Sequence, residues 1–278
     1  MKKIVLIDGH NLLFRMFYGI PAPIRNSKGI DIRGLIGFIG GLKKIVEEFK
    51  PYSVYVVFDS ETSKNSNLEI DDNYKANRID YSKLEDDENP FAQLPMIKKS
   101  LDYLGIDYLE VQDYETDDFI ASLVSRDNGI FEYVIVSTDS DFVQLVDENI
   151  HLYVPRGKKS ILYTPEEVIN KYKVNPSKYI LFKSLVGDKT DNIKGVKGIG
   201  KMTAAKILEY NSLEDFMESN PDSKYSFLLK ENEYLIDRNQ KLIRLNRELD
   251  TSSVIFKELS KTIYESKTYE IIDAIKER

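Results

Sequence analysis

The stretch IVLID, residues 4–8, decides the fold, because a short, mostly β-branched apolar run that ends in an acidic residue is typical of a buried strand and the turn after it. Similar runs recur along the chain, and longer segments with helical spacing of apolar residues separate most of them. The strand-like runs are Ile4–Ile7, Val54–Phe58, Ile106–Val111, Tyr133–Val136 and Ile150–Val154, and the helical segments include Leu35–Phe49, Phe91–Leu104 and Asp117–Val124. This alternation predicts an α/β fold with a mainly parallel sheet and helices on both faces.

The strand pattern stops at about Thr164, and helical spacing follows, with Pro165 well suited to a first helical turn. We therefore predict an α/β core over residues 1–163 and a helical region over residues 164–278. One stretch of the core, residues 60–90, carries nine acidic and four basic side chains. Its polar composition predicts a long, mobile insertion over about residues 60–95.

Composition excludes several kinds of protein and site. The chain has 278 residues and 42% hydrophobic content, enough for a core, but its apolar runs are too short for a transmembrane helix or a signal peptide. We therefore expect a cytoplasmic protein without membrane contact. Cysteine is absent, and the two histidines, His10 and His151, are too few for a multi-histidine site and are expected to be structural or incidental. Any bound metal should be a hard cation with oxygen ligands.

The charge is unevenly distributed along the chain. The formal net charge of −7 argues against nucleic acid as a partner, yet residues 171–206 contain nine lysines and only two acidic residues, Asp188 and Asp191. Such a run is either a solvated helical face or a surface that contacts phosphates. Composition alone leaves both interpretations open.

Acidic residues follow the strand-like runs at the points where each run ends. These residues are Asp8, Asp59, the group Glu115, Asp117 and Asp118, and the pair Asp139 and Asp141. The carboxyl ends of parallel strands meet at one edge of a sheet, so we expect the side chains to converge there. Each acid alone could be a turn former or a helix N-cap.

Residue spacing supports this convergence. Asp139 and Asp141 are two apart, which in extended backbone directs both side chains to one face, whereas Glu115 and Asp118 are three apart, as suits one face of a helix. Asp188 and Asp191 repeat the spacing of three. Crowded carboxylates destabilise a fold unless cations neutralise them, and two divalent ions would also activate water and stabilise a displaced phosphate oxygen.

A glycine-rich element lies inside the lysine-rich stretch, in KGVKGIGKMTAAK, residues 194–206. Glycine allows backbone N–H groups to approach a ligand, and a helix that follows favours an anion. The glycine spacing differs from that of a nucleotide-binding P-loop, and no clear strand precedes it. We therefore interpret the element as a hairpin between two helices that holds a DNA backbone phosphate without reading sequence.

Taken together, these residues resemble the bacterial 5′-nuclease domain of DNA polymerase I and its free-standing and phage relatives among the flap endonucleases. The matching blocks occur in the order of that family: IDGHNLLFR (7–15), VVFD (56–59), YKANR (74–78), YETDD (114–118), STDSDFVQL (137–145) and GDKTDNIKGVKGIGKMTA (187–204). The resemblance implies a Rossmann-like (PIN-like) core, an arch over the insertion, and a helix-three-turn-helix DNA-binding element at about residues 176–210.

The resemblance also implies roles for individual residues. One metal cluster would contain Asp8, Asp59, Glu115 and Asp117, with Asp118 close by, and the other Asp139, Asp141, Asp188 and Asp191. Two Mg²⁺ ions, replaceable by Mn²⁺, would occupy them, and K⁺ is a candidate at the hairpin. Lys75 and Arg78 would meet the scissile phosphate. The other implied DNA contacts are Arg15, Tyr74, Lys194, Gly195, Lys197, Gly198, Gly200, Lys201 and Thr203.

The implied function is a metal-dependent, monomeric 5′-3′ exonuclease and flap endonuclease acting on DNA flaps, nicks and branches in primer removal and repair, with replication or repair proteins as candidate partners. Two departures concern the arch: Asn67 stands where most relatives have arginine, and residues 85–88 are all acidic. A non-catalytic junction-binding relative is therefore the main alternative. An RNA-directed nuclease and an aspartyl-phosphate phosphatase, which expects an acid at position 10, are more distant ones.

Overall fold

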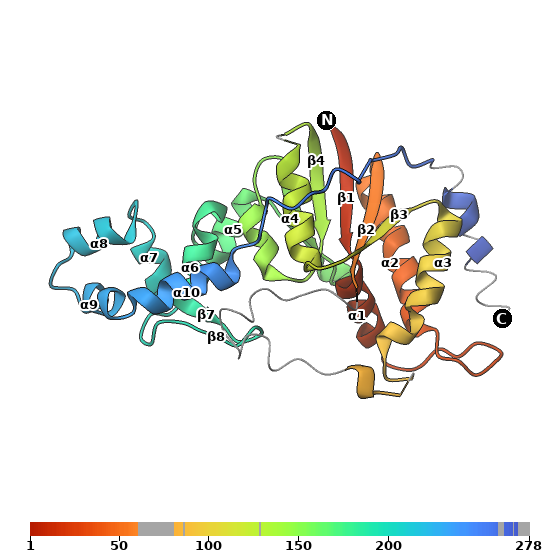
Figure 1. Cartoon of the computed structure of the whole chain (residues 1–278), viewed down its shortest axis with the longest axis horizontal. Coiled ribbons are helices and arrows are strands. Elements are labelled where there is room, and N and C mark those ends of the chain that lie inside the picture. The colour runs from red at the N-terminus through yellow and green to blue at the C-terminus, as the bar shows by residue number, and fades with distance from the viewer. Residues whose placement is uncertain (61–80, 86, 128, 261–263, 269, 272–278) are drawn as a thin grey trace.

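The computed structural model describes residues 1–60, 81–85, 87–127, 129–260, 264–268 and 270–271. The arch residues singled out from the sequence, Asn67, Tyr74, Lys75 and Arg78, lie outside these described residues. Within them, an α/β sheet domain is followed by a helical region, as predicted (Figure 1). None of the helices in these described ranges is long and apolar enough to cross a membrane.

One six-stranded sheet forms the centre of the fold. Its order is β3-β2-β1-β4-β5-β6, and all neighbours are parallel except β5 and β6. The strands are β1 (Lys2–Asp8), β2 (Ser53–Asp59), β3 (Asp107–Val111), β4 (Phe131–Val136), β5 (Ile150–Val154) and β6 (Ile161–Tyr163). All five predicted strands are therefore confirmed. The antiparallel β6 was not predicted, because three residues are too few to show a periodic pattern.

Helices cover both faces of this sheet, which explains why β1 is apolar on both sides. Ile4 and Leu6 face the layer that contains α4, whereas Val5 and Ile7 face α1, α2 and α3, and all four side chains are fully buried. The helices are α1 (Gly9–Gly19), α2 (Arg33–Phe49), α3 (Leu94–Leu104) and α4 (Thr116–Arg126).

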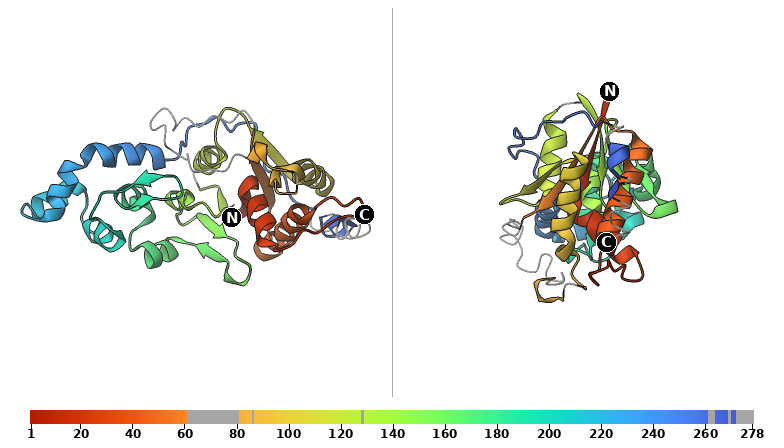
Figure 2. Two further views of the ribbon diagram at one scale, coloured as in Figure 1. Left: turned by 90° about the horizontal axis from the view of Figure 1, so that it is seen from below. Right: turned by 90° about the vertical axis from the view of Figure 1, so that its right-hand side faces the viewer.

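The helical region lies at the opposite end of the molecule from α2 and α3 (Figures 1 and 2). Its helices are α5 (Pro165–Tyr172), α6 (Tyr179–Val186), α7 (Lys201–Ile207), α8 (Leu213–Ser219), α9 (Lys224–Glu231) and α10 (Glu233–Ile243). Their apolar residues continue the core on the α4 face of the sheet. The expectation that no strand follows Thr164 was wrong in one place. There, β7 (Gly187–Asp188) and β8 (Ile193–Lys194) form an antiparallel hairpin. Strands of two residues are too short to show an alternating pattern in the sequence.

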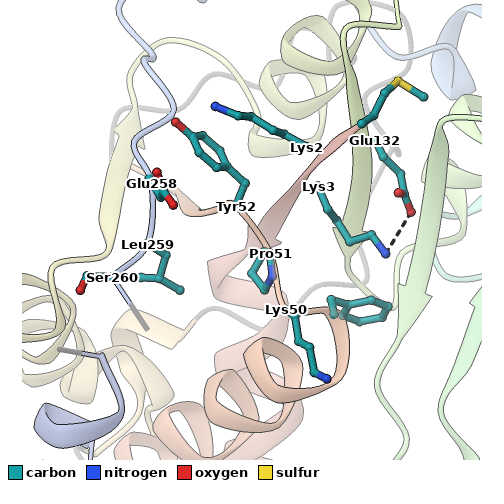
Figure 3. Close-up of a pocket in the computed structure, with 11 residues that line it drawn as sticks. Lys2, Lys3, Lys50, Pro51, Tyr52, Glu132, Glu258, Leu259 and Ser260 are labelled. Carbon is teal, nitrogen blue, oxygen red and sulfur yellow. Dashed lines mark ion pairs between the residues drawn. The ribbon is translucent and has the colours of Figure 1, made fainter. Parts of the chain in front are cut away.

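After α10, the chain is extended rather than helical and returns across the sheet domain. Residues 246–260, which we call the return segment, run beside α4 and then over the amino-terminal edge of the sheet (Figure 1). Arg126 of α4 donates to the carbonyl oxygens of Thr251 and Val254, and Leu259 N donates to Tyr52 O at 2.7 Å. Leu259 thereby closes one side of a pocket lined by Lys2, Lys3, Lys50 and Tyr52 (Figure 3).

Candidate active site

Asp8 lies at the carboxyl end of β1 and is also the N-cap of α1. Asn11 N donates to Asp8 Oδ1 at 3.1 Å, and Ser137 Oγ, from the end of β4, donates to Asp8 Oδ2 at 2.9 Å. Asn11 Oδ1 accepts from Thr138 N at 2.8 Å, which ties α1 to the same strand end. Sequence reasoning missed these three positioning residues, although all lie inside the matching blocks. They hold the Asp8 carboxylate in one orientation.

Asp59 ends the neighbouring strand, β2, and lies beside Asp8. Its Oδ1 accepts from Thr116 N at 2.8 Å, and its Oδ2 is 3.2 Å from His10 Nδ1. Burial raises the pKa of Asp59, but His10 and the Thr116 N–H outweigh this effect and hold it below its usual value. The expectation that His10 is merely structural is therefore incomplete, because its ring also contacts a candidate ligand.

The environment of Asp8 shows that negative charge is crowded at this edge. Burial and the nearby charges of Asp59 and Asp139 together raise its pKa to about 7, although the hydrogen bonds from Asn11 and Ser137 act in the opposite direction. The predicted convergence of strand-end carboxylates is thus observed for Asp8, Asp59 and Asp139. We call these three residues the first carboxylate group.

Asp139 and Asp141 lie where the chain leaves β4. The backbone after β4 is not extended but enters a 3₁₀ helix, Ser140–Leu145, and Asp139 caps it by accepting from Asp141 N at 2.8 Å. The charge of Asp139 acts on Asp8 and also on Asp141 and Lys183. Asp141 is buried and contacts Lys183 of the helical region.

The acids after β3 have separate surroundings. Glu115 is the N-cap residue of α4, next to the Thr116 N–H that binds Asp59. Asp117 Oδ1 accepts from Asp118 N, and Asp118 Oδ1 accepts from Asn246 N of the return segment at 2.7 Å. One oxygen of Asp118 therefore anchors this segment, a pairing that the spacing from Glu115 did not predict.

A second carboxylate group, Asp141, Asp188 and Asp191, surrounds the ammonium of Lys183. This lysine comes from α6 and is only 4% exposed. Its Nζ donates to Asp141 Oδ1, lies 2.6 Å from Asp188 Oδ2 and is 3.9 Å from Asp191 Oδ2. Burial opposes the charge of Lys183, but the surrounding aspartates outweigh it and hold its pKa well above the usual value.

The two groups differ in how well they fit a divalent ion. Among the residues that the structure describes, no three carboxylates or histidines converge closely enough to hold an ion as they stand. The first group nevertheless has the right chemistry, since it offers hard oxygen donors and an excess of buried negative charge that raises the pKa of Asp8. In the second group burial likewise raises the pKa of Asp141 to about 7, but the Lys183 ammonium acts in the opposite direction and lies between the carboxylates.

Burial also changes the interpretation of the lysine-rich stretch. Lys183 is internal, Lys178 donates to the carbonyl oxygens of Leu208 and Tyr210, and Lys171 donates to the Tyr163 hydroxyl. Lys183 is therefore buried and Lys178 partly buried, whereas Lys171 is still exposed although its ammonium has a partner. The exposed lysines around the hairpin are Lys189, Lys194, Lys197, Lys201 and Lys206.

The glycines in and just after the β7–β8 hairpin have two different structural roles. A side chain on Gly195 would place its Cβ 2.3 Å from the backbone of Val186, and one on Gly187 would place it 2.4 Å from Gly195 N. Glycine is therefore required at position 195 by close packing of backbone on backbone, and its phosphate contact stays a prediction. Gly198 and Gly200 lie in the exposed turn before α7. Gly198 has a φ of +96°, and a side chain on Gly200 would meet open space. Thr203, in α7, is partly buried.

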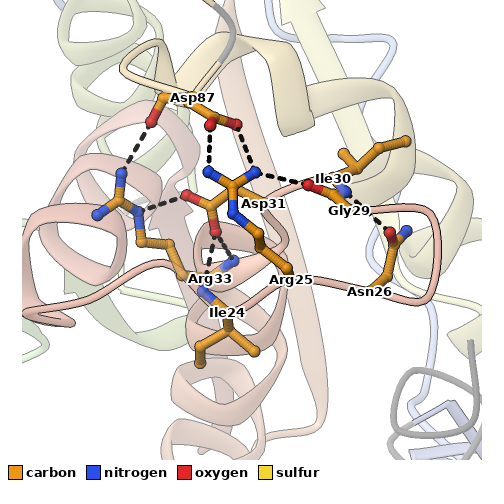
Figure 4. Close-up of polar contacts among 8 residues, drawn as sticks. All are labelled: Ile24, Arg25, Asn26, Gly29, Ile30, Asp31, Arg33 and Asp87. Atoms are coloured by element: carbon orange, nitrogen blue, oxygen red, sulfur yellow. Dashed lines mark hydrogen bonds and ion pairs between the residues drawn. The ribbon is translucent and has the colours of Figure 1, made fainter.

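Two further features border the carboxyl edge. Arg15 is exposed on α1 and lines a groove together with Lys44, Arg156 and Lys158. Arg25, in the loop before α2, and Arg33, the first residue of α2, both bind Asp87, which lies within the predicted insertion (Figure 4). His151 is 3.9 Å from Glu132, apart from the two carboxylate groups.

A parallel sheet with buried carboxylates at its carboxyl edge, followed by a helical region with an exposed lysine-rich hairpin, defines a nuclease of the α/β class. The N-terminal resolvase-like domain of 5′-3′ exonucleases matches residues 3–173, and the C-terminal SAM fold of 5′-3′ exonucleases matches residues 174–264. The chain belongs to the 5′-3′ exonuclease family.

Known proteins of this kind are similar over much of the chain. The chain is 34% identical to a 5′-3′ exonuclease of Aquifex aeolicus, over 90% of this chain and 84% of that protein. It is 36% identical to a thermostable DNA polymerase I of Thermus thermophilus over 78% of this chain, but spans only 25% of the polymerase. The fold resembles that of a bacteriophage T5 flap endonuclease in complex with DNA and metal ions, at a TM-score of 0.70, 22% identity and full coverage of both chains.

Proposed function

We propose that the protein is a structure-selective 5′-nuclease that hydrolyses DNA phosphodiesters at flaps, nicks and branched junctions, with a role in primer removal and repair. The observation that carries this proposal is the first carboxylate group. Asp8, Asp59 and Asp139 meet where burial and the neighbouring carboxylates raise the pKa of Asp8 to about 7. Divalent ions such as Mg²⁺ or Mn²⁺ would remove that charge conflict.

The first carboxylate group would hold these ions, with Glu115 and Asp117 as further ligands from the start of α4. Bound divalent ions supply an activated water and offset charge on the displaced phosphate oxygen. Ser137 and Asn11 orient Asp8, and the Thr116 N–H orients Asp59, so both carboxylates are held before an ion arrives. Asp118 would bind an ion through Oδ2, because its Oδ1 accepts from Asn246 N.

The DNA contacts are proposed on two surfaces. Lys194, Lys197 and Lys201 are exposed on and after the hairpin and would bind backbone phosphates of the duplex, with K⁺ as a candidate ion there. Lys75 and Arg78 would offset charge on the scissile phosphate, and Tyr74 would stack on a base. The T5 enzyme that contains DNA and metal ions supports this assignment through its shared fold. We expect a monomer.

A 5′-labelled flap oligonucleotide tests the proposal. We expect cleavage near the branch with Mg²⁺ or Mn²⁺, none in EDTA, and a loss of at least about a hundredfold for Asp139→Ala. Asp222→Ala, in an exposed loop of the helical region, is the matched control and should cleave like the wild type.

Three outcomes would oppose the proposal. Binding of the flap without cleavage in either metal would select the non-catalytic junction-binding alternative. Preference for an RNA flap of the same structure would select an RNA-directed nuclease. Equal cleavage by Asp139→Ala and wild type would exclude the first carboxylate group as the catalytic centre.

A further inference from the structure

Lys183 occupies an unusual position for a lysine. It lies in α6 between Phe182 and Leu185, which both pack in the core, and the side chain is almost completely buried. A buried ammonium is stable only where carboxylates compensate for lost hydration. Lys183 meets this condition through the second carboxylate group, Asp141, Asp188 and Asp191.

The ammonium joins two parts of the molecule. Asp141 belongs to the 3₁₀ helix at the carboxyl edge of the sheet, whereas Asp188 and Asp191 belong to the β7–β8 hairpin and its turn. Lys183 Nζ donates to Asp141 and lies within hydrogen-bonding distance of Asp188. The hairpin is thereby fastened to the sheet domain by a positive charge between carboxylates.

A divalent ion and this ammonium would compete for the same place. An ion coordinated directly by Asp141 and Asp188 must lie between their oxygens, about 2.0 to 2.6 Å from each. The Lys183 nitrogen already lies there, at 2.6 Å from Asp188 Oδ2 and in contact with Asp141 Oδ1. Lys183 also acts on Asp139 through its charge, but the hydrogen bonds that the described residues give to Asp8 and Asp139 come from Asn11, Ser137 and Asp141 N.

We propose that Lys183 is the resident cation of the second carboxylate group and competes with divalent ions for Asp141 and Asp188. This inference rests on the proposed function, in which the first carboxylate group binds divalent ions. The second group then acts as an electrostatic clamp between hairpin and sheet. A second direct metal site of equal affinity arises only when the ammonium is removed or displaced.

The experiment counts bound Mn²⁺ by electron paramagnetic resonance in the DNA-free, full-length protein. Wild type should bind Mn²⁺ at the first carboxylate group. Lys183→Met should bind one further ion, or bind Mn²⁺ at least about tenfold more tightly at its weakest site. In EDTA this variant should melt several degrees below wild type and regain most of the loss with Mn²⁺, because the ion replaces the lost charge.

Lys178→Met is the matched control. Lys178 is a partly buried lysine of the same region, but its Nζ donates to the carbonyl oxygens of Leu208 and Tyr210. Its loss should lower the melting temperature without adding an Mn²⁺ site and without rescue by Mn²⁺. An equal rescue of both variants would overturn the proposal, because the effect would then not be specific to the carboxylates.

Asp188→Asn gives a second test in case Lys183→Met does not fold. If Lys183 is the resident cation, this change should leave the number and affinity of Mn²⁺ ions within about twofold of wild type, whereas Asp139→Asn should weaken binding at least about tenfold. An equal loss in both variants would overturn the proposal and make Asp188 a metal ligand. Absence of any Mn²⁺ binding by wild type would instead contradict the proposed function itself.

Discussion

At the scale of single residues, Asp8 shows how burial converts an ordinary strand-end acid into a site that requires a cation. The carboxylate is fixed by Asn11 and Ser137, but it lies beside Asp59 and Asp139. Hydrogen bonds to the charged form are therefore insufficient to offset desolvation and repulsion. Asp8 is thus held in one orientation and is destabilised by its own charge.

The raised pKa of Asp8 predicts how stability depends on pH in the metal-free protein. The folded protein keeps a proton on Asp8 that the unfolded chain loses at its ordinary pKa of 3.8, so stability should fall as pH rises from about 4 to about 7. Urea unfolding in EDTA at pH 5.5, 6.5 and 7.5 measures this slope. Asp8→Asn, which carries no charge, should show a smaller slope than wild type. An unchanged slope would contradict the raised pKa.

At the scale of elements, the β7–β8 hairpin depends on close approach of its two strands. Gly187 has a φ of +82°, and a Cβ there would lie 2.4 Å from Gly195 N, so both strain and overlap oppose any side chain. The hairpin carries Asp188 on one strand and Lys194 on the other. Glycine is therefore required for a structural reason before any contact with DNA is considered.

Two alanine substitutions test whether the close backbone approach at Gly187 stabilises the protein. Gly187→Ala should lower the free energy of unfolding by about 1 to 3 kcal/mol, because the backbone must shift. Gly200→Ala should change it by less than about 1 kcal/mol, since φ there is negative and the surrounding space is open. Urea unfolding of both variants at one pH makes the comparison. Equal losses would show that the close approach does not decide hairpin stability.

The exposed lysines on and after the β7–β8 hairpin predict that the affinity for DNA depends on salt concentration. Lys197→Ala should weaken binding of flap DNA in Ca²⁺ and lower the slope of log affinity against log salt by about 0.9, the value for one lost phosphate contact. Lys257→Ala, also exposed but on the return segment and paired with Asp107, should leave the slope unchanged. Binding isotherms at four KCl concentrations test both. A slope unaffected by Lys197→Ala would remove this residue from the DNA surface.

At the scale of the whole molecule, the return segment joins the end of the helical region to the sheet domain. Arg126 on α4 binds the carbonyl oxygens of Thr251 and Val254, and Phe256 packs against Tyr133. Asp118 adds a bond to Asn246 N. Residues far apart along the chain therefore hold α4 in place, and α4 in turn presents the Thr116 N–H to Asp59.

Loss of Arg126 should release this segment. Arg126→Ala removes a partly buried guanidinium with several acceptors, so unfolding free energy should fall by about 1 to 3 kcal/mol, and amide hydrogen exchange should increase over residues 246–256. Lys257→Ala breaks only an exposed ion pair and should cost less than about 1 kcal/mol. Unchanged exchange in Arg126→Ala would show that other contacts hold the segment.

Local patterns in the sequence by themselves determined the five parallel strands, the helices between them and the positions of the strand-end acids. This was possible because strand and helix periods are local properties of apolar residues, and parallel strands bring their carboxyl ends to one edge. The first carboxylate group follows from these rules. The glycine-rich element, residues 194–206, follows α6 but includes most of α7, and the β7–β8 hairpin just before it was not predicted.

Only the tertiary structure decided the partners of these side chains. Asp118 meets Asn246 across 128 positions, Asp141 meets Lys183 across 42, and Gly195 packs against the backbone of Val186. Local spacing contains no information on such pairs, because burial and long-range packing select them. The acid after the first strand, Asp8, was predictable from five letters of sequence, whereas the burial that gives it a pKa of about 7 was not.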